Sequence, residues 1–260
     1  MKGREKFRSR FKKDQMKKGI YVLPNLFTTA SLFSGVFSIT ASMKEDFLRA
    51  AFAVIIALVL DGLDGRMARM THTTSRFGTE YDSLSDLVAF GVAPAMLAYT
   101  WALSAFGKWG WIAAFLYVAC GALRLARFNV QVNIMDKKIF NGLPIPAAAF
   151  VIATSVILHD FLGEAGTFEN ISVLIGVFAV SILMVSSVKY YSFKDLNYFL
   201  RKPFMSFILI IFILIIVVAE PQIMAFTFAF GYALSGPVSA TLKIIRHRHL
   251  QTEHIEHPLI

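Results

Sequence analysis

The stretch that decides the fold is residues 51–69, which read AFAVIIALVLDGLDGRMAR. An apolar run leads into two aspartates, Asp61 and Asp64, three positions apart. A carboxylate costs about 2.5–3.5 kcal/mol at the centre of a spanning helix and less toward the interface. With about 3.6 residues per turn, residues three apart share one helix face. The pattern predicts a membrane-spanning helix that presents paired acids near one face of the bilayer.

The rest of the chain has the same membrane character. Its 260 residues are 56% hydrophobic and 17% charged, with a net charge of +9 and one cysteine, Cys120. A soluble domain carries about 25% charged residues, so the composition excludes an ordinary soluble enzyme, a disordered chain and a disulfide scaffold. Runs of roughly 20 apolar residues predict an all-α, polytopic membrane protein with about eight transmembrane helices. These are expected at 22–42, 47–68, 83–106, 109–131, 145–162, 170–189, 204–219 and 221–241.

We expect one folded domain, since no repeat and no Gly/Ser linker divides the chain. A basic arm (1–19) precedes a six-helix core (20–190), two additional transmembrane helices (191–242) and a tail (243–260). Glu220-Pro221-Gln222 is expected to form a tight turn between the last two helices.

The distribution of basic residues predicts the orientation. Of the 26 Lys and Arg residues, all but Lys44, Arg49 and Lys108 lie in the termini and in alternate connections. Cytoplasmic segments are enriched in Lys and Arg, so both termini are expected in the cytoplasm, which requires an even number of spans. We expect a multi-pass protein of the cell (inner) membrane with its acidic site on the cytoplasmic side. The basic arm would be attracted to anionic membrane lipids, and no nucleic-acid partner is expected.

A second acidic pair, Asp82 and Asp86, opens the third expected span with a spacing of four. A short connection makes the second and third spans antiparallel neighbours, so the four acids can converge. Oxygen ligands without Cys or His favour hard divalent cations such as Mg²⁺ or Mn²⁺. Two such ions could bridge a phosphate and stabilise an in-line displacement.

Structural interpretations of the same residues stay open. Gly62, Gly65 and Ala68 have the spacing of helix-packing residues. Asp82 follows Thr79 by three positions and could complete a capping box. Asp64 could pair with Arg66 or Arg69. Each alternative is plausible alone, but four structural acids on two neighbouring helices are improbable.

The spacing D-x2-D-G-x2-A-R-x8-G-x3-D-x3-D, from Asp61 to Asp86, resembles the signature of the CDP-alcohol phosphatidyltransferases without departure. The resemblance implies a homodimer and a six-helix catalytic core in which four aspartates hold two divalent cations, Mg²⁺ or Mn²⁺. It also implies that Asp86 is the general base. The residues that it assigns to the metals are Asp61, Asp64, Asp82 and Asp86, and those that it assigns to the CDP-lipid are Asn25, Gly65, Arg69, Ser75 and Gly78.

Two further stretches bear on the alcohol that accepts the lipid. Residues 124–129 (RLARFN) and 140–147 (FNGLPIPA), together with 24–28 (PNLFT), resemble the membrane-embedded phosphatidylserine synthases of bacteria and archaea. The resemblance implies that L-serine and CDP-diacylglycerol give phosphatidylserine and CMP. Arg124 and Arg127 share a helix face, as a pair that binds the serine carboxylate would, and Asn129 is a further candidate. The alternative is that both arginines extend to the lipid headgroups.

Two other functions compete with this hypothesis. A phosphatidylglycerophosphate synthase would share the motif but should line its pocket with more basic residues. A cation-coupled transporter would also use intramembrane acids, but near the bilayer midplane and on interrupted helices. The acids here gather at one face beside Arg69, which favours the enzyme.

Overall fold

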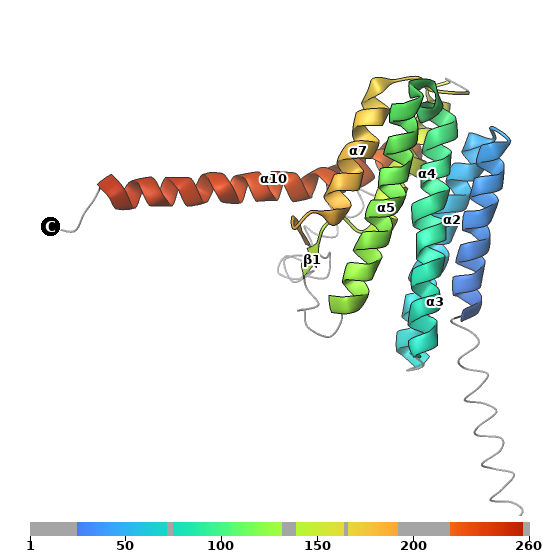
Figure 1. Ribbon diagram of the computed structural model, residues 1–260, viewed down its shortest axis with the longest axis horizontal. Coiled ribbons are helices and arrows are strands. Elements are labelled where there is room, and N and C mark those ends of the chain that lie inside the picture. Colours follow the sequence, from blue (N-terminus) through green and yellow to red (C-terminus); the bar gives the residue numbers. More distant parts are fainter. Residues whose placement is uncertain (1–24, 72–74, 132–138, 164–165, 192–218, 257–260) are drawn as a thin grey trace, which may run out of the picture.

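The structure, a computed structural model, describes residues 25–71, 75–131, 139–163, 166–191 and 219–256. It is helical apart from one pair of three-residue strands (Figure 1). A helix over Asn25–Met43 comes first. The other elements are α2 (Phe47–Thr71), α3 (Arg76–Asp86), the π-helical η1 (Leu87–Val92), α4 (Ala93–Ala98), the π-helical η2 (Tyr99–Leu103), the 3-10 turn η3 (Ser104–Phe106), α5 (Lys108–Gln131), β1 (Ile139–Asn141), α6 (Ile145–Phe161), α7 (Ile171–Val185), β2 (Lys189–Tyr191) and α10 (Pro221–Glu256).

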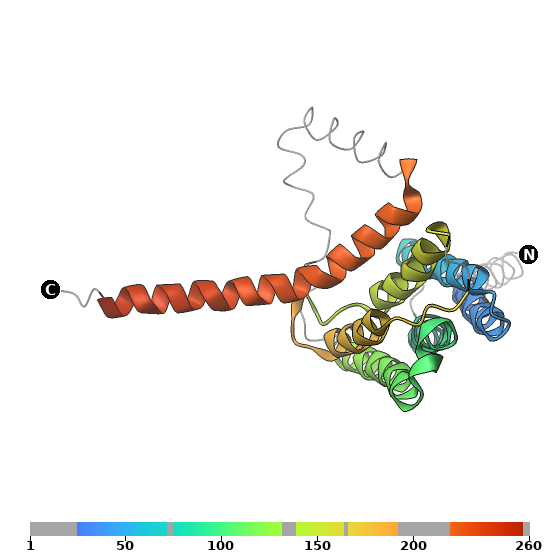
Figure 2. The ribbon, with the colours of Figure 1, turned by 90° about the horizontal axis from the view of Figure 1, so that it is seen from above.

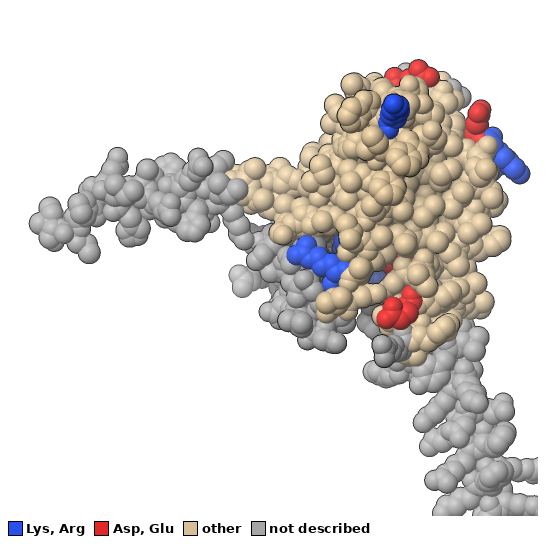
Figure 3. All heavy atoms as spheres, in the orientation of Figure 1, with Lys and Arg blue, Asp and Glu red and all other residues tan. Residues whose placement is uncertain are grey.

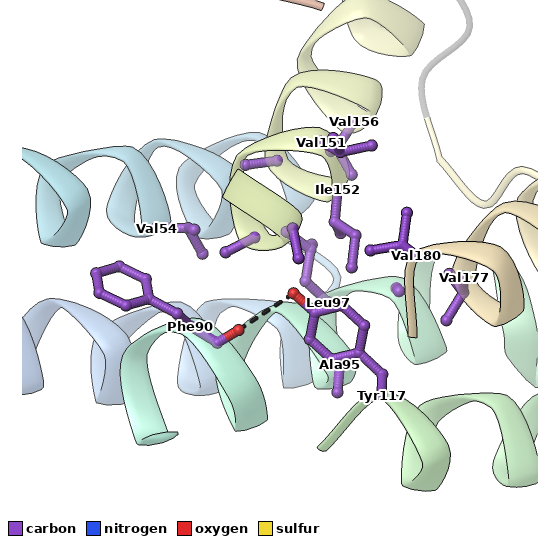
Figure 4. Packing of buried hydrophobic residues seen from close by; sticks show 14 of the residues in the cluster. Val54, Phe90, Ala95, Leu97, Tyr117, Val151, Ile152, Val156, Val177 and Val180 are labelled. Carbon is purple, nitrogen blue, oxygen red and sulfur yellow. Dashed lines mark hydrogen bonds between the residues drawn. The ribbon is translucent and has the colours of Figure 1, made fainter. Parts of the chain in front are cut away.

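The helices before α10 form an upright bundle, which Figure 2 views almost end-on. Its core is built from alanines and branched side chains, so the helices approach one another closely. Val54 of α2, Phe90 of η1 and Ile152 of α6 are among the buried residues (Figure 4). The buried Tyr117 of α5 donates a hydrogen bond of 3.2 Å to the Phe90 carbonyl, which satisfies the one polar group of its side chain.

α10 runs across the direction of the other helices and extends well beyond the bundle (Figures 1 and 2). Its first half packs against α6 and β2. The sequence predicted a span over 221–241, but the helix continues to Glu256, into the segment that we expected to be a tail.

Four described helices are long and apolar enough to cross a membrane, namely Asn25–Met43, Phe77–Phe106, Lys108–Val130 and Pro221–Leu242. α6 and α7 are shorter apolar helices, and α2 carries the acids. The span expected at 204–219 lies outside the described residues except for its last position. The all-helical membrane fold is therefore confirmed in its coarse form, and the number of eight spans stays a prediction.

Two further expected boundaries were wrong. The third helix begins at Arg76 rather than at residue 83, because its first turns are polar and amphipathic and give no hydropathy signal. The helix expected over 170–189 ends at Val185, because the chain then turns into β2.

The surface of the bundle agrees with a membrane environment. In Figure 3 a broad band without charged side chains covers the helices, and charged residues lie at its upper and lower margins. Large apolar side chains are exposed on the outer surface of the bundle, including Phe33, Phe52, Ile56 and Phe115. An exposed apolar surface of this extent is unfavourable in water and favourable in lipid.

The strand pair was not predicted from the sequence. β1 and β2 run antiparallel, with Phe140 opposite Tyr190. Gly142 follows β1 with φ of +80°, where an added Cβ would lie 2.3 Å from the Met184 carbonyl oxygen. Its N–H donates to the Val188 carbonyl at 2.8 Å. Only glycine fits this position, which explains the Gly142-Leu143-Pro144 stretch in structural terms.

Close packing at Gly35 gives a first testable result. A Cβ at Gly35 would lie 2.7 Å from the Cα of Ala89, so the first helix touches η1 directly. Helix interiors gain up to about 1 kcal/mol from Gly→Ala, whereas forced overpacking costs about 1–3 kcal/mol. We expect Gly35→Ala to lower the melting temperature in detergent. Gly176→Ala in α7, where nothing lies within 4 Å, is the matched control and should not lower it. Equal melting temperatures of the two variants would contradict this packing.

Candidate active site

Three carboxylates meet where α2 faces α3. One oxygen each of Asp61, Asp82 and Asp86 lies within 4.8 Å of the others, and all three side chains are half-buried. Asp61 comes from the second half of α2, and the other two share one face of α3. Like charges at this separation repel one another strongly in a partly desolvated site, so a positive partner would stabilise the ionised cluster.

Asp64 is held slightly apart from these three acids. Its side chain is only 7% exposed and accepts a hydrogen bond from the Thr28 hydroxyl of the first helix. It still interacts electrostatically with Asp61, Asp82 and Asp86. The structure thus brings three of the predicted ligands together and holds the fourth beside them, against the first helix.

Hydroxyl groups fix the first helix to the acidic helices. Ser85, next to Asp86, donates a hydrogen bond of 3.0 Å to the Thr28 carbonyl. Ser31 donates to the Ala57 carbonyl of α2 at 3.1 Å. Our sequence reasoning gave no role to Ser85 or Ser31. The available signal was the recurrence of Ser and Thr in the otherwise apolar stretch 28–42, since a buried hydroxyl in a membrane helix needs a partner.

The N-terminus of α3 gathers three of the residues assigned to the CDP-lipid. Ser75 caps the helix and accepts a hydrogen bond of 3.0 Å from the Gly78 N–H. A Cβ at Gly78 would lie 3.1 Å from the Ser75 hydroxyl and 3.5 Å from the Asn25 side-chain oxygen. Gly78 therefore lies close to both polar side chains, and a larger residue there would crowd the Ser75 hydroxyl. Thr79 lies inside the helix, which removes the capping-box interpretation of Asp82.

The two remaining candidates for CDP-lipid contact lie on α2. Gly65 is half-buried, one position after Asp64. Arg69 belongs to the last turns of α2, but its side chain lies outside what the structure describes.

The candidates for the acceptor have different partners. Arg124 of α5 is 9% exposed, interacts electrostatically with Asp86, and its Nε has no hydrogen-bond partner among the described residues. Asn129 donates to the Ser83 hydroxyl at 2.9 Å, which ties α5 to α3 beside Asp82. Arg127 instead reaches the Val185 carbonyl of α7 at 3.4 Å. The structure brings Arg124 to the acids and directs Arg127 away from them.

The residues present fit a divalent cation. Three clustered carboxylates, with a fourth beside them and no Cys or His in the group, form a hard oxygen donor set of the kind that binds Mg²⁺ or Mn²⁺. A bound cation would also supply the positive charge that the repulsion among these acids demands.

Comparisons with known proteins identify the family. The family model of the CDP-alcohol phosphatidyltransferases matches residues 21–187, which include all four acids, Arg124 and the first helix. The chain belongs to this family. α10 lies beyond the matched residues.

Curated relatives give the comparison more detail. A CDP-diacylglycerol–serine O-phosphatidyltransferase of Helicobacter pylori is 44% identical over 208 residues, which cover 78% of this chain and 84% of the relative. One of Bacillus subtilis is 36% identical, covering 66% of this chain and 91% of the relative. An archaetidylserine synthase of Methanothermobacter thermautotrophicus is 38% identical, covering 65% and 69%.

Proposed function

We propose that the protein is a CDP-diacylglycerol–serine O-phosphatidyltransferase, with residues 20–190 as its catalytic core. The observation that carries this proposal is the buried Arg124 beside the carboxylate cluster of Asp61, Asp82 and Asp86. Acids that hold divalent cations suit a diphosphate donor, and an adjacent guanidinium suits an acceptor that bears a carboxylate. The names of the relatives support the same donor and acceptor.

The reaction is a direct displacement at phosphorus. The serine hydroxyl oxygen forms a bond to the phosphorus that carries diacylglycerol. The bond from that phosphorus to the bridging oxygen breaks, and CMP leaves with the electron pair. Asp86 takes the hydroxyl proton as general base, a role worth about 10²–10⁴ in rate. The products are phosphatidylserine and CMP, and the acyl chains stay in the bilayer throughout.

We propose that Asp61, Asp64, Asp82 and Asp86 together hold two divalent cations, Mg²⁺ or Mn²⁺. When bound, such ions neutralise charge on the diphosphate and on the departing CMP. The hydrogen bond from Thr28 orients the Asp64 carboxylate through one oxygen, and we propose that the other oxygen is the cation ligand.

The donor is proposed to bind at the N-terminus of α3. Asn25, Ser75 and Gly78 converge there, and a helix N-terminus offers unpaired N–H groups to a phosphate. Gly65 lets the diphosphate approach the backbone of α2, and Arg69 is a candidate for a bidentate phosphate contact. On the acceptor side, Arg124 binds the serine carboxylate. Asn129 and Arg127, the further candidates for serine, support that subsite from a distance by holding α5 against α3 and α7.

We further propose that the protein resides in the cell (inner) membrane with both termini and the active site in the cytoplasm. The charge distribution along the sequence supports this orientation. A homodimer also stays a prediction that rests on the family resemblance, and light scattering of the purified protein in detergent would measure it.

Single cysteines test the orientation. In a Cys120→Ala background, we expect Lys44→Cys to react with a membrane-impermeant maleimide in spheroplasts. Glu80→Cys should react only after lysis. Both native side chains are exposed, so accessibility within the protein does not limit either reaction. Labelling of Glu80→Cys, but not of Lys44→Cys, in intact spheroplasts would contradict the proposed orientation.

The function itself is tested by CMP release. Purified protein receives CDP-diacylglycerol and Mn²⁺ or Mg²⁺, with serine, glycerol 3-phosphate or inositol as single acceptors. We expect release only with serine. Release with glycerol 3-phosphate alone would indicate a phosphatidylglycerophosphate synthase, and no release with any acceptor would favour a cation-coupled transporter.

A further inference from the structure

The buried Arg124 has a hydrogen-bond donor without an acceptor among the described residues, which points to a ligand as the acceptor. Arg124 is 9% exposed, yet its Nε has no hydrogen-bond partner among the described residues. An unsatisfied buried donor costs about 1–3 kcal/mol, and more for a charged group. A protein tolerates this cost at a position that a ligand completes. Among the described residues, the titratable groups that interact electrostatically with Arg124 are Asp86, from the catalytic cluster, and the neutral phenol of Tyr232, from α10.

α10 is anchored to β2 by a specific contact with Tyr190. The buried Tyr190 of β2 donates a hydrogen bond of 2.9 Å to the Ala233 carbonyl, and its ring centroid lies 5.5 Å from that of Tyr232. A Cβ at Gly236 would lie 2.3 Å from the Tyr190 ring, so this glycine lets the helix sit directly on the ring. The contact holds this part of α10, which crosses the other helices (Figure 2), and keeps Tyr232 within electrostatic range of Arg124.

We propose that Tyr232 and Arg124 together form the subsite for the α-carboxylate of the acceptor, so that α10 supplies a specificity-determining residue to the active site. This inference rests on the proposed function, because it assigns to α10 one part of the recognition of serine. The guanidinium and the phenol O–H both donate hydrogen bonds, as a carboxylate requires. Arg124 also interacts electrostatically with Asp86, the residue proposed to take the proton of the serine hydroxyl.

The proposal gives α10 a role beyond the segment that the family shares. The family model matches residues 21–187, whereas α10 begins at Pro221. An acceptor alcohol without a carboxylate would make no hydrogen bond to Tyr232 in this subsite. The hydroxyl of Tyr232 should therefore affect the use of serine and leave the use of CDP-diacylglycerol unchanged.

The first test is Tyr232→Phe, assayed as serine-dependent CMP release over ranges of both substrates. We expect the KM for serine to rise about tenfold, the equivalent of one hydrogen bond to a charged group, with the KM for CDP-diacylglycerol unchanged. Tyr117→Phe is the control, because it removes a phenol hydroxyl elsewhere in the bundle, the one that donates to the Phe90 carbonyl. It should leave both KM values as in the wild type.

The second test displaces α10 and keeps Tyr232. Gly236→Ala drives a methyl group into the Tyr190 ring, whereas Gly231→Ala on the same helix meets nothing within 4 Å. Both changes alter helix propensity equally, so only the contact differs. We expect Gly236→Ala to raise the KM for serine and Gly231→Ala to leave it unchanged.

The outcomes separate the two proposals. A wild-type protein that releases CMP with serine, together with an unchanged KM for serine in Tyr232→Phe, overturns the role of α10 and leaves the proposed function intact. A wild-type protein that ignores serine overturns both. Equal rises of both KM values in Tyr232→Phe would assign Tyr232 to general packing and also overturn the inference.

Discussion

An Asp86→Asn variant is expected to lose about a thousandfold in serine-dependent CMP release, the largest effect of any single substitution considered. Asn keeps the shape of the side chain, but it accepts no proton from the serine hydroxyl, and general-base catalysis is worth about 10²–10⁴ in rate. It also removes one of the three carboxylates that lie within 4.8 Å of one another. The measurement is the initial rate of CMP release at saturating serine and CDP-diacylglycerol.

The control for this substitution is Asp46→Asn. Asp46 lies in the connection before α2, where it pairs with Arg49 at 3.0 Å, far along α2 from the cluster. We expect this variant to keep its full rate. An Asp86→Asn protein that is folded, as judged by its elution and melting temperature, and that retains a rate close to the wild type would refute the role of Asp86.

An Arg124→Leu variant is expected to raise the KM for serine by about a hundredfold. Hydrogen bonds to charged groups are worth about 1.5–3 kcal/mol, and each 1.4 kcal/mol is a factor of ten. Leucine fills much of the buried volume without supplying a donor, so the carboxylate of serine loses its partner. CDP-diacylglycerol is assigned to the N-terminus of α3, so its KM should stay as in the wild type. Steady-state kinetics in mixed micelles with either substrate varied would measure both constants.

Two comparisons make the Arg124 result specific. Arg49→Leu removes an exposed arginine at the other end of α2 and should change neither constant. Arg124→Lys retains the positive charge but not the planar fork of donors, so its KM for serine should lie between those of the wild type and Arg124→Leu. A KM for serine that is the same in Arg124→Leu and the wild type would remove Arg124 from the acceptor subsite.

Much of the fold follows from hydropathy alone. α5 and α6 begin and end within one residue of the expected bounds, because long apolar runs have few alternatives in a membrane. The convergence of Asp61, Asp82 and Asp86 was also predictable, since spacings of three and four place acids on one helix face and a short connection makes the helices neighbours.

Boundaries and partners that depend on polar residues were harder to predict. α3 starts at Arg76 because Ser75 caps it, a signal that a search for apolar runs ignores. The bond from Thr28 to Asp64 joins residues far apart in the sequence, and no periodicity relates them. Arg124 and Arg127 share a helix face by their spacing. In the structure, however, Arg127 donates to a carbonyl of α7, whereas Arg124 interacts electrostatically with Asp86.

The direction of α10 is a further feature that its sequence does not contain. Its apolar composition predicts a membrane span equally well whether it runs along the bundle or across it. Its observed placement depends on the fit of Gly236 to Tyr190, which is a tertiary contact. The approach of Tyr232 to Arg124 depends on that same contact and was missing from our sequence-based site for this reason.

The most direct test of the account is a competition among acceptors. Purified protein, CDP-diacylglycerol and Mn²⁺ or Mg²⁺ are incubated with serine, glycerol 3-phosphate and inositol at equal concentrations, and the lipid product is identified by mass spectrometry. The account predicts phosphatidylserine, formed in amounts equal to the CMP released. Phosphatidylglycerophosphate or phosphatidylinositol as the main product would contradict the assignment of serine, and the absence of any new phospholipid would contradict the phosphatidyl transfer itself.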